Sequence, residues 1–212
     1  MSLGTYLLAG LRMLGYKNEA VEDARNAPLG NAWSVLLGVA LVYAVAYSAL
    51  IALWPAGIFS PQGVTFGASL SKYWQLVLIG MFALTIGSAW LYVGVMHLCA
   101  RLLGGQASIT QYFRTDMALT AGMLVITLPM ATLQVTLTGT GNMLYSLLLL
   151  PVQLCFGIYA ITLQVFVIRQ TYALSTGRAI VAWLLLVAAV ILVVLLAVVA
   201  FLGGIALFLR AA

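Results

Sequence analysis

Charge is what this chain has least of: only 6% of its 212 residues are charged, and Asp and Glu together number four. Soluble domains carry about 25% charged residues, so this composition excludes a water-soluble globule. Hydrophobic residues make up 65% of the chain, and the mean hydropathy is +1.15. Several apolar runs reach the roughly 18 residues that indicate a spanning helix, whereas a membrane barrel would show short alternating segments. We therefore expect an all-α membrane protein.

Residues that catalyse reactions or hold metals are almost as scarce. The chain has one histidine, His97, and two cysteines, Cys99 and Cys155. His97 and Cys99 are two positions apart, which directs them to different faces of a helix, and a zinc-type site needs several such ligands. We therefore expect no catalytic residue, metal or cofactor, and no enzyme. The cysteines fall at different expected depths in the membrane, so we expect no disulfide.

The net charge of +5 comes from nine basic residues that are spread thinly along the chain. Because they form no run or patch, they do not indicate nucleic acid as a partner. The first residues lack the basic start and the long apolar core of a secretory signal, so we expect none.

Five segments are long and apolar enough to cross a bilayer, namely residues 32–54, 74–98, 117–137, 143–168 and 179–209. They predict a bundle of five transmembrane helices over residues 31–212, preceded by a cytoplasmic or interfacial segment, residues 1–30. The last span is longer than the hydrocarbon layer requires. It must therefore tilt, bend at Gly203–Gly204, or extend beyond the membrane.

The basic residues also predict the orientation of these spans. Seven would lie on one side of the membrane and two on the other, Lys72 and Arg210. Because cationic loops stay in the cytoplasm, we expect the N-terminus inside and the C-terminus outside, in a bacterial cytoplasmic membrane. The seven are Arg12, Lys17, Arg25, Arg101, Arg114, Arg169 and Arg178.

The N-terminal segment shows helical periodicity. Its leucines at positions 3, 7, 11 and 14 fall on one face, which predicts a short amphipathic helix at the interface, ended by Gly15. A second, polar helix would begin with Asn18 as its cap and end before Pro28. The alternative is a solvated extension.

The stretch "LLGGQASITQYFRTD" is the most polar interval in the middle of the chain. Gly104–Gly105 would end the second span. Ser108 and Gln111 have the spacing of a capping box and predict a short amphipathic helix over "SITQYFR". Thr115 or Asp116 would then cap the third span, where the helix dipole favours a carboxylate. Ser175 or Thr176 would start the fifth.

Three stripes run along the expected spans. Gly80, Gly87 and Gly94 share one face of the second span and predict close approach of another helix. The polar stripes consist of Asp116, Thr120, Thr127 and Gln134 in the third span, and of Gln153 and Gln164 in the fourth. They could bond across helix interfaces, for about 0.6–2 kcal/mol each, or line a cavity. We favour the structural interpretation because no charged residue is expected well inside any span. The fifth span has no comparable polar residue and would be peripheral.

Two stretches together resemble the Yip1 domain family. The first is "HLCARLLGGQASITQYFR", with His97 and Leu98 before the paired glycines, and the second is "RQTYALSTGRAIVAWLLL", with Leu174 to Ala179 at the entry to the last span. The resemblance covers about Pro28 to the C-terminus and implies five spans with a cytoplasmic N-terminus. Eukaryotic members associate with small GTPases of the Rab class, but this chain lacks their long N-terminal region and its Asp-Leu-Tyr-Gly-Pro motif. It is more similar to the bacterial or archaeal branch.

These observations predict a non-enzymatic scaffold or adaptor that presents a cytoplasmic face to a protein partner, a second copy or lipid headgroups. The candidate residues of that face are Gly104, Gly105, Ser108, Gln111, Arg114, Ser175, Thr176, Gly177 and Arg178. One alternative is a small transporter, channel or lipid-handling protein, which requires the two polar stripes to face each other around a cavity. Another is an accessory subunit of a larger membrane complex.

Overall fold

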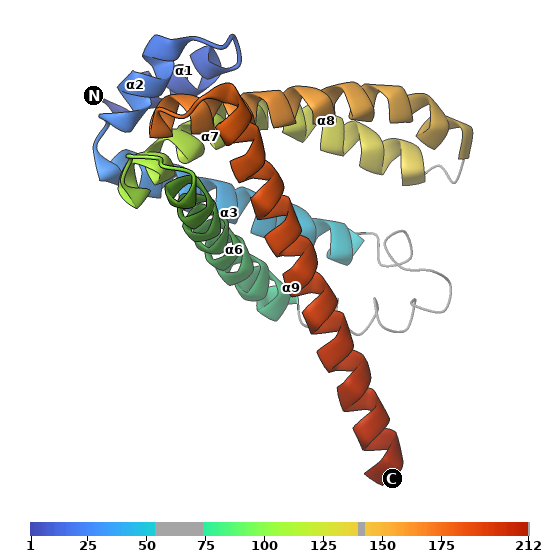
Figure 1. Cartoon of the computed structure of the whole chain (residues 1–212). Coiled ribbons are helices and arrows are strands. Elements are labelled where there is room, and N and C mark those ends of the chain that lie inside the picture. The colour runs from blue at the N-terminus through green and yellow to red at the C-terminus, as the bar shows by residue number, and fades with distance from the viewer. Residues whose placement is uncertain (54–73, 140–142, 212) are drawn as a thin grey trace.

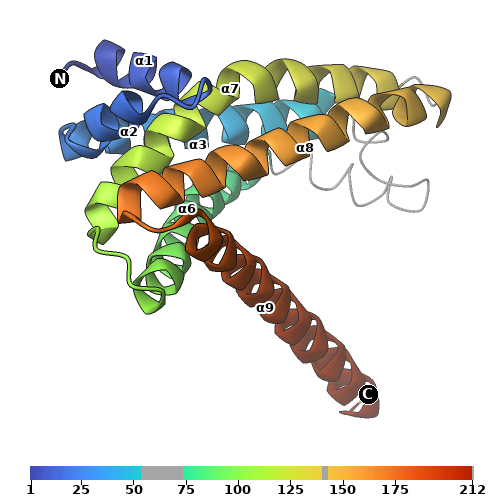
Figure 2. The same ribbon diagram turned by 45° about the horizontal axis from the view of Figure 1, so that its top comes forward.

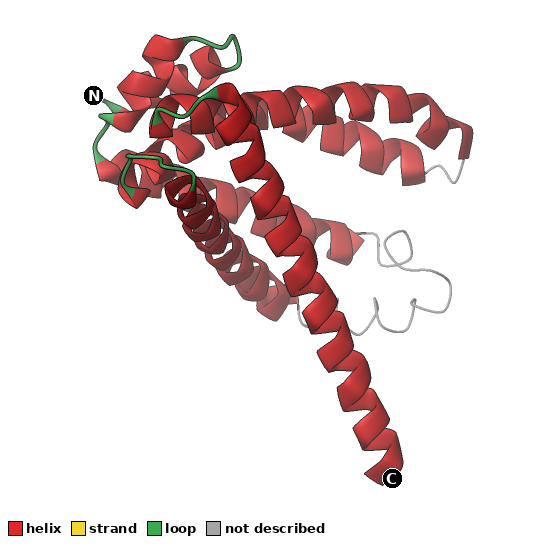
Figure 3. Cartoon of the chain, viewed as in Figure 1, coloured by secondary structure: helices red, strands yellow, loops and turns green. Residues whose placement is uncertain are grey.

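The computed structural model describes residues 1–53, 74–139 and 143–211, and every regular element in these ranges is an α-helix (Figures 1 and 3). The two short N-terminal helices are α1 (Leu3–Met13) and α2 (Asn18–Arg25). The long helices are α3 (Leu29–Leu53), α6 (Trp74–Leu102), α7 (Ile109–Gly139), α8 (Met143–Tyr172) and α9 (Thr176–Ala211).

Four helices in the described ranges are long and apolar enough to cross a membrane, over Leu29–Ala46, Trp74–Leu102, Leu149–Tyr172 and Thr176–Leu196. The expected all-helical, multi-pass class is therefore confirmed. The expected third span corresponds to α7, which has 31 residues but a more polar composition and is not one of these four.

The long helices converge at one end of the molecule and diverge toward the other (Figures 1 and 2). The N-terminus, the α6–α7 connection and the α8–α9 connection all lie at the convergent end, and the C-terminal end of α9 lies far from it. The buried core is concentrated there, with Met96 of α6, Phe113 of α7 and Ile168 of α8 fully enclosed. Farther along α9, Val190 to Leu196 are more than half exposed, as suits a helix surrounded by lipid.

The N-terminal helices pack on this core instead of forming a solvated extension. Helix α1 lies along α7 (Figure 2) and buries Tyr6 and Met13, while Leu3 and Leu7 remain about 40% exposed. Leu3 and Leu7 line a groove with residues of α3 and α7, whereas Leu14 packs on the core, so the leucine stripe is only partly exposed. The Tyr6 hydroxyl donates to the Arg114 carbonyl, and burial raises the pKa of Tyr6, so this donor stays protonated at neutral pH.

A close contact between two helices is made by glycines that do not belong to the predicted stripe. A Cβ atom on Gly10 of α1 would lie 2.1 Å from the Ala118 carbonyl oxygen of α7, and one on Gly122 would lie 2.4 Å from the Gly10 carbonyl oxygen. By contrast, no described heavy atom lies within 4 Å of a Cβ built on Gly80, Gly87 or Gly94. The prediction of a close approach at that stripe is wrong, because regular spacing defines a helix face but not what packs on it.

The capping box is confirmed, but the separate short helix that it was predicted to start is not. Ser108 N donates to Gln111 Oε1 at 2.9 Å, and Gln111 N donates to Ser108 Oγ at 3.3 Å. From there α7 runs unbroken to Gly139. The Thr115 hydroxyl bonds back to the Tyr112 carbonyl at 2.9 Å, so neither Thr115 nor Asp116 caps a helix. No proline or glycine lies between Ile109 and Asp116, and the helix therefore continues past the predicted cap.

Of the other two predicted caps, Ser175 is confirmed and the cap of α2 is displaced by one residue. Ser175 caps α9 by accepting from Arg178 N at 3.5 Å, and α9 then continues through Gly203–Gly204 without a break. Asn18 is the first residue of α2, and Lys17 occupies the cap position. The side chain of Asn18 instead accepts a hydrogen bond from Gln170 at 2.9 Å, which ties α2 to α8.

Candidate functional site

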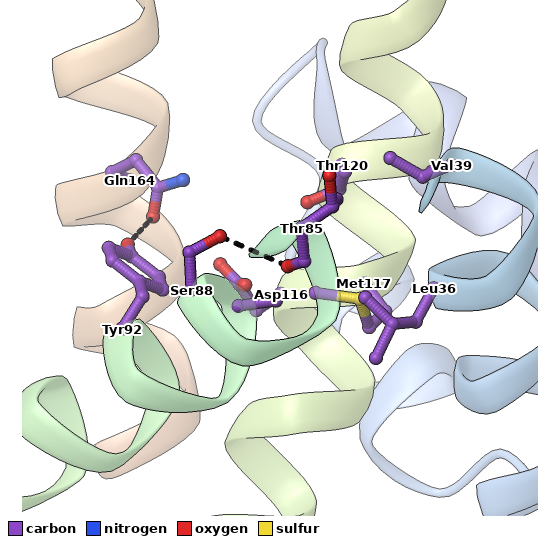
Figure 4. A pocket seen from close by; sticks show the side chains of 10 residues that line it. Leu36, Val39, Thr85, Ser88, Tyr92, Asp116, Met117, Thr120 and Gln164 are labelled. Atoms are coloured by element: carbon purple, nitrogen blue, oxygen red, sulfur yellow. Dashed lines mark hydrogen bonds between the residues drawn. The ribbon is translucent and has the colours of Figure 1, made fainter. Parts of the chain in front are cut away.

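A polar cavity of about 340 Å³ lies among α3, α6, α7 and α8 (Figure 4). Helix α3 contributes only apolar side chains, whereas the other three helices contribute hydroxyl, carboxyl and amide groups. The lining residues are Leu36 and Val39 of α3, Thr85, Ser88, Ala89 and Tyr92 of α6, Asp116, Met117 and Thr120 of α7, and Gln164 of α8.

Asp116 is the only charged residue in this lining, and it is 3% exposed. Its carboxyl group receives hydrogen bonds from Gln164 and Tyr112. Among the described residues, no group bonds to its Oδ1 atom. Figure 4 shows the carboxyl directed toward the side of the cavity where Ser88 and Tyr92 of α6 lie. The cavity is therefore bordered by a buried acceptor atom that no described group pairs with.

A chain of hydroxyl and amide groups holds the Asp116 carboxyl in place. Tyr92 donates to Gln164 Oε1 at 2.8 Å, and the Tyr92 hydroxyl lies 3.1 Å from the Tyr112 hydroxyl. Because Gln164 accepts through its oxygen, its amide nitrogen is left to donate to Asp116. Three helices thus fix the orientation of one carboxyl group.

The hydroxyl groups of α6 add further acceptors. Thr85 Oγ1 donates to the Met81 carbonyl at 2.8 Å, and Ser88 Oγ donates to the Thr85 carbonyl at 3.0 Å. Since each hydroxyl has a single hydrogen, which is used within its own helix, both oxygens present lone pairs to the cavity. Together with Asp116 they make the cavity rich in acceptors.

This arrangement is complementary to a ligand with positive charge and hydrogen-bond donors. No Lys, Arg or His belongs to the lining, and burying a carboxylate without a counter-charge is unfavourable. A volume near 340 Å³ is at the lower end of the range for small-molecule sites. The described residues contain no group of three His, Cys, Asp or Glu side chains placed to hold a metal.

The cavity unites part of the two predicted polar stripes. Asp116, Thr120 and Gln164 line it, whereas Thr127 and the exposed Gln153 lie outside it. The side chain of Gln134 lies outside the described residues. The remaining positions of the stripes lie farther along α7 and α8, which run side by side toward their connection (Figures 1 and 2).

The sequence interpretation expected no charged residue well inside any span and did not predict that Asp116 would be buried among the helices. That expectation placed Asp116 at a helix start, but α7 begins at Ile109, about two turns earlier. The sequence interpretation did not include Thr85, Ser88 and Tyr92. Their spacing of three and four residues along α6 places them on one helix face and was the available signal.

The predicted partner-binding residues lie together, at the convergent end, where the two loops contact each other. Gln106 N donates to the Tyr172 carbonyl at 3.3 Å, and Arg178 Nη1 donates to the Leu103 carbonyl at 3.5 Å. Gly105 is buried, and a Cβ there would lie 2.9 Å from the Tyr172 ring. Gly104 has a φ of +91°, a conformation that favours glycine.

Other members of this set have intramolecular roles or remain exposed. Arg114 Nη1 donates to the Arg25 carbonyl at 3.2 Å and so holds the end of α2. Thr176 accepts from Arg169, while Ser175, Gly177 and Arg178 are exposed. His97 Nδ1 lies 2.9 Å from the Tyr172 hydroxyl. Cys99 is buried, Cys155 is exposed and both are free thiols, so the expected absence of a disulfide between them is confirmed.

Comparison with protein-family models, with curated proteins and with solved structures found no match to this chain. The class that the fold defines is an all-helical, multi-pass membrane protein. Its described part contains an open cavity, lined in part by hydrogen-bond acceptors and by the buried Asp116, near the end where its helices converge.

Proposed function

We propose that this protein binds a small, positively charged polar solute in the cavity around Asp116 and acts as a small transporter of that solute. The observation that supports this most directly is the unpaired Oδ1 atom of a carboxyl group that is 3% exposed. Ionisable residues inside membrane bundles are rare and usually mark substrate or ion pathways. The surrounding oxygen acceptors favour a ligand that donates hydrogen bonds, such as a small ammonium compound.

The proposal includes a membrane arrangement. Helix α7 is the third of five spans, and the convergent end faces the cytoplasm of a bacterial cell, with the C-terminus on the other side. Seven of the nine basic residues belong to α1, α2 and the two loops at that end or to the helix ends beside them, which supports this orientation. The exposed leucines of α1 would then lie in the membrane interface.

The test uses the intact protein in lipid nanodiscs and measures its thermal unfolding with added methylammonium, ethanolammonium or choline. A ligand that binds only the folded protein raises the unfolding temperature, and the stabilisation grows with the logarithm of the ligand concentration above its Kd. We expect at least one of these cations to raise it, and dimethylbutanol, the uncharged carbon isostere of choline, to have no effect.

Two variants decide whether the effect arises in the cavity. Asp116→Asn keeps the shape of the side chain and removes its charge, so the stabilisation by the cation should disappear. Asp23→Asn removes the charge of the other aspartate, which is exposed on α2, and should leave it unchanged. If no cation stabilises the protein, or if Asp116→Asn responds like the wild type, the proposal is wrong.

A second candidate function is the non-enzymatic Yip1-type scaffold that the sequence resembles. Ser175, Gly177 and Arg178 are exposed beside Gly104 at the convergent end, which favours a shared docking face. Gly177→Arg adds a bulky group where a Cβ meets no neighbour within 4 Å, so it should abolish crosslinking to a partner without disturbing the fold. An unchanged crosslinking profile would count against the scaffold function.

A further inference from the structure

A second cavity, of about 480 Å³, lies between α8 and α9 and is separate from the one around Asp116. One end is polar and contains Arg169 and Thr176, while Tyr16 lies farther along the groove, against Thr162 and Phe166. The other end is apolar and contains Phe166, Ile180 and Trp183. The groove is thus divided between a cationic end and an apolar end.

The cationic end can bind an anionic group. Arg169 is exposed and has five N–H donors, of which Nη1 donates to Thr176 at 3.3 Å. Thr176 is the first residue of α9, and the free backbone N–H groups of a helix start attract anions. A guanidinium group and a helix start beside each other suit a phosphate.

The apolar end follows the two helices toward the middle of the membrane. From Arg169 to Ile161, α8 rises about 12 Å at roughly 1.5 Å per residue. One leaflet of the hydrocarbon core is about 15 Å thick. The groove therefore covers most of the depth of a leaflet, with its cation at the end where the basic loops lie.

We infer that this groove is a binding site for an anionic glycerophospholipid of the leaflet at the convergent end. The phosphate lies against Arg169 and the start of α9, and one acyl chain lies between α8 and α9 beside Trp183. A cation between helices at the membrane surface is the arrangement that attracts anionic headgroups. This site does not depend on the proposed solute cavity, which lies on other faces of the bundle.

The test places the intact protein in phosphatidylcholine vesicles to which a small fraction of a brominated lipid is added. The brominated lipid is phosphatidylglycerol in one sample and phosphatidylcholine in the other, and the bromine atoms are on the acyl chains. Bromine quenches nearby tryptophan fluorescence, and the contribution of Trp183 is the signal that is lost in Trp183→Phe. We expect brominated phosphatidylglycerol to quench that contribution about fivefold more effectively than brominated phosphatidylcholine, the preference that one surface cation provides.

Three variants separate the groove from general attraction to a basic surface. Arg169→Gln should abolish the preference, and Arg169→Lys should keep most of it because the charge remains. Arg12→Gln removes an exposed cation of α1 outside the groove and should leave the preference unchanged. Equal quenching by the two lipids, no quenching of Trp183, or a preference that survives Arg169→Gln would each overturn the inference.

Discussion

The Tyr92 hydroxyl determines which end of the Gln164 amide faces Asp116. It donates to Gln164 Oε1 at 2.8 Å, so the amide nitrogen remains on the side of the carboxyl group. A reversed amide would place two acceptors against each other. Tyr92 therefore positions a ligand-binding carboxyl through a second side chain.

We predict that Tyr92→Phe weakens binding of the stabilising ammonium compound about two- to tenfold, the equivalent of roughly 0.5–1.5 kcal/mol for one hydrogen bond. Thermal-shift titrations in nanodiscs measure this affinity. Tyr43→Phe removes the hydroxyl of an exposed tyrosine on α3 and serves as the control. Equal affinity in the two variants would show that Tyr92 has no positioning role.

Gly105 was predicted to bind a partner, but intramolecular packing explains why this position holds a glycine. We predict that Gly105→Ala destabilises the protein, because the new methyl group would lie 2.9 Å from both the Tyr172 ring and the Ala100 carbonyl oxygen. Overpacking of this kind costs about 1–3 kcal/mol. Gly177→Ala is the matched control, since its Cβ meets nothing within 4 Å. Similar unfolding temperatures for both variants would contradict this role.

At the scale of elements, α1 is joined to the bundle by the contact between Gly10 and Gly122. We predict that Gly10→Ala loosens α1, because its Cβ would lie 2.1 Å from the Ala118 carbonyl oxygen, a backbone atom that cannot move aside. Amide hydrogen exchange over Leu3–Met13 should become faster while exchange in α9 stays unchanged.

The control for this prediction is Gly87→Ala on α6. Gly87 belongs to a regular glycine stripe, yet its Cβ meets no described atom within 4 Å. Exchange in α1 should therefore match the wild type. Were Gly87→Ala to loosen the bundle and Gly10→Ala to leave it intact, the packing described for α1 would be wrong.

Element boundaries were predictable wherever a local interaction determines them. The capping pair Ser108–Gln111 and the cap Ser175 interact with backbone groups three residues away, so the sequence contains the whole interaction. The end of the predicted "SITQYFR" helix was not predictable from the sequence, because Asp116 could either cap a new helix or lie within a continuous α7. Continuation is favoured when Thr115 bonds back to its own helix.

At the scale of the whole molecule, the N-terminus, the α6–α7 and α8–α9 connections and most basic residues lie at the convergent end (Figure 1). The exposed apolar part of α9 lies far from this end. A bilayer can accommodate this distribution when the convergent end lies at its cytoplasmic surface.

We predict that single cysteines at Ser2 and Ala211 label from opposite sides of the membrane. The background for both variants is Cys99→Ala with Cys155→Ala, which removes the two native thiols. A membrane-impermeant maleimide applied to sealed vesicles of known orientation is the measurement. Gln106→Cys, in the exposed α6–α7 loop, should label from the same side as the Ser2 position. Labelling of both chain ends from one side would contradict the proposed topology.

The sequence by itself determined that this is a multi-pass helical membrane protein, roughly where its long helices lie, and which caps start two of them. Hydropathy and capping depend on residues within a few helical turns of each other, so they can be predicted from the sequence without knowing which helices pack together. Only the tertiary structure decided that Asp116 is buried with Thr85, Ser88 and Gln164 around one cavity, and that Gly10 meets Gly122. These contacts join segments far apart in the chain, and their geometry depends on how whole helices cross, which no local pattern of residues specifies.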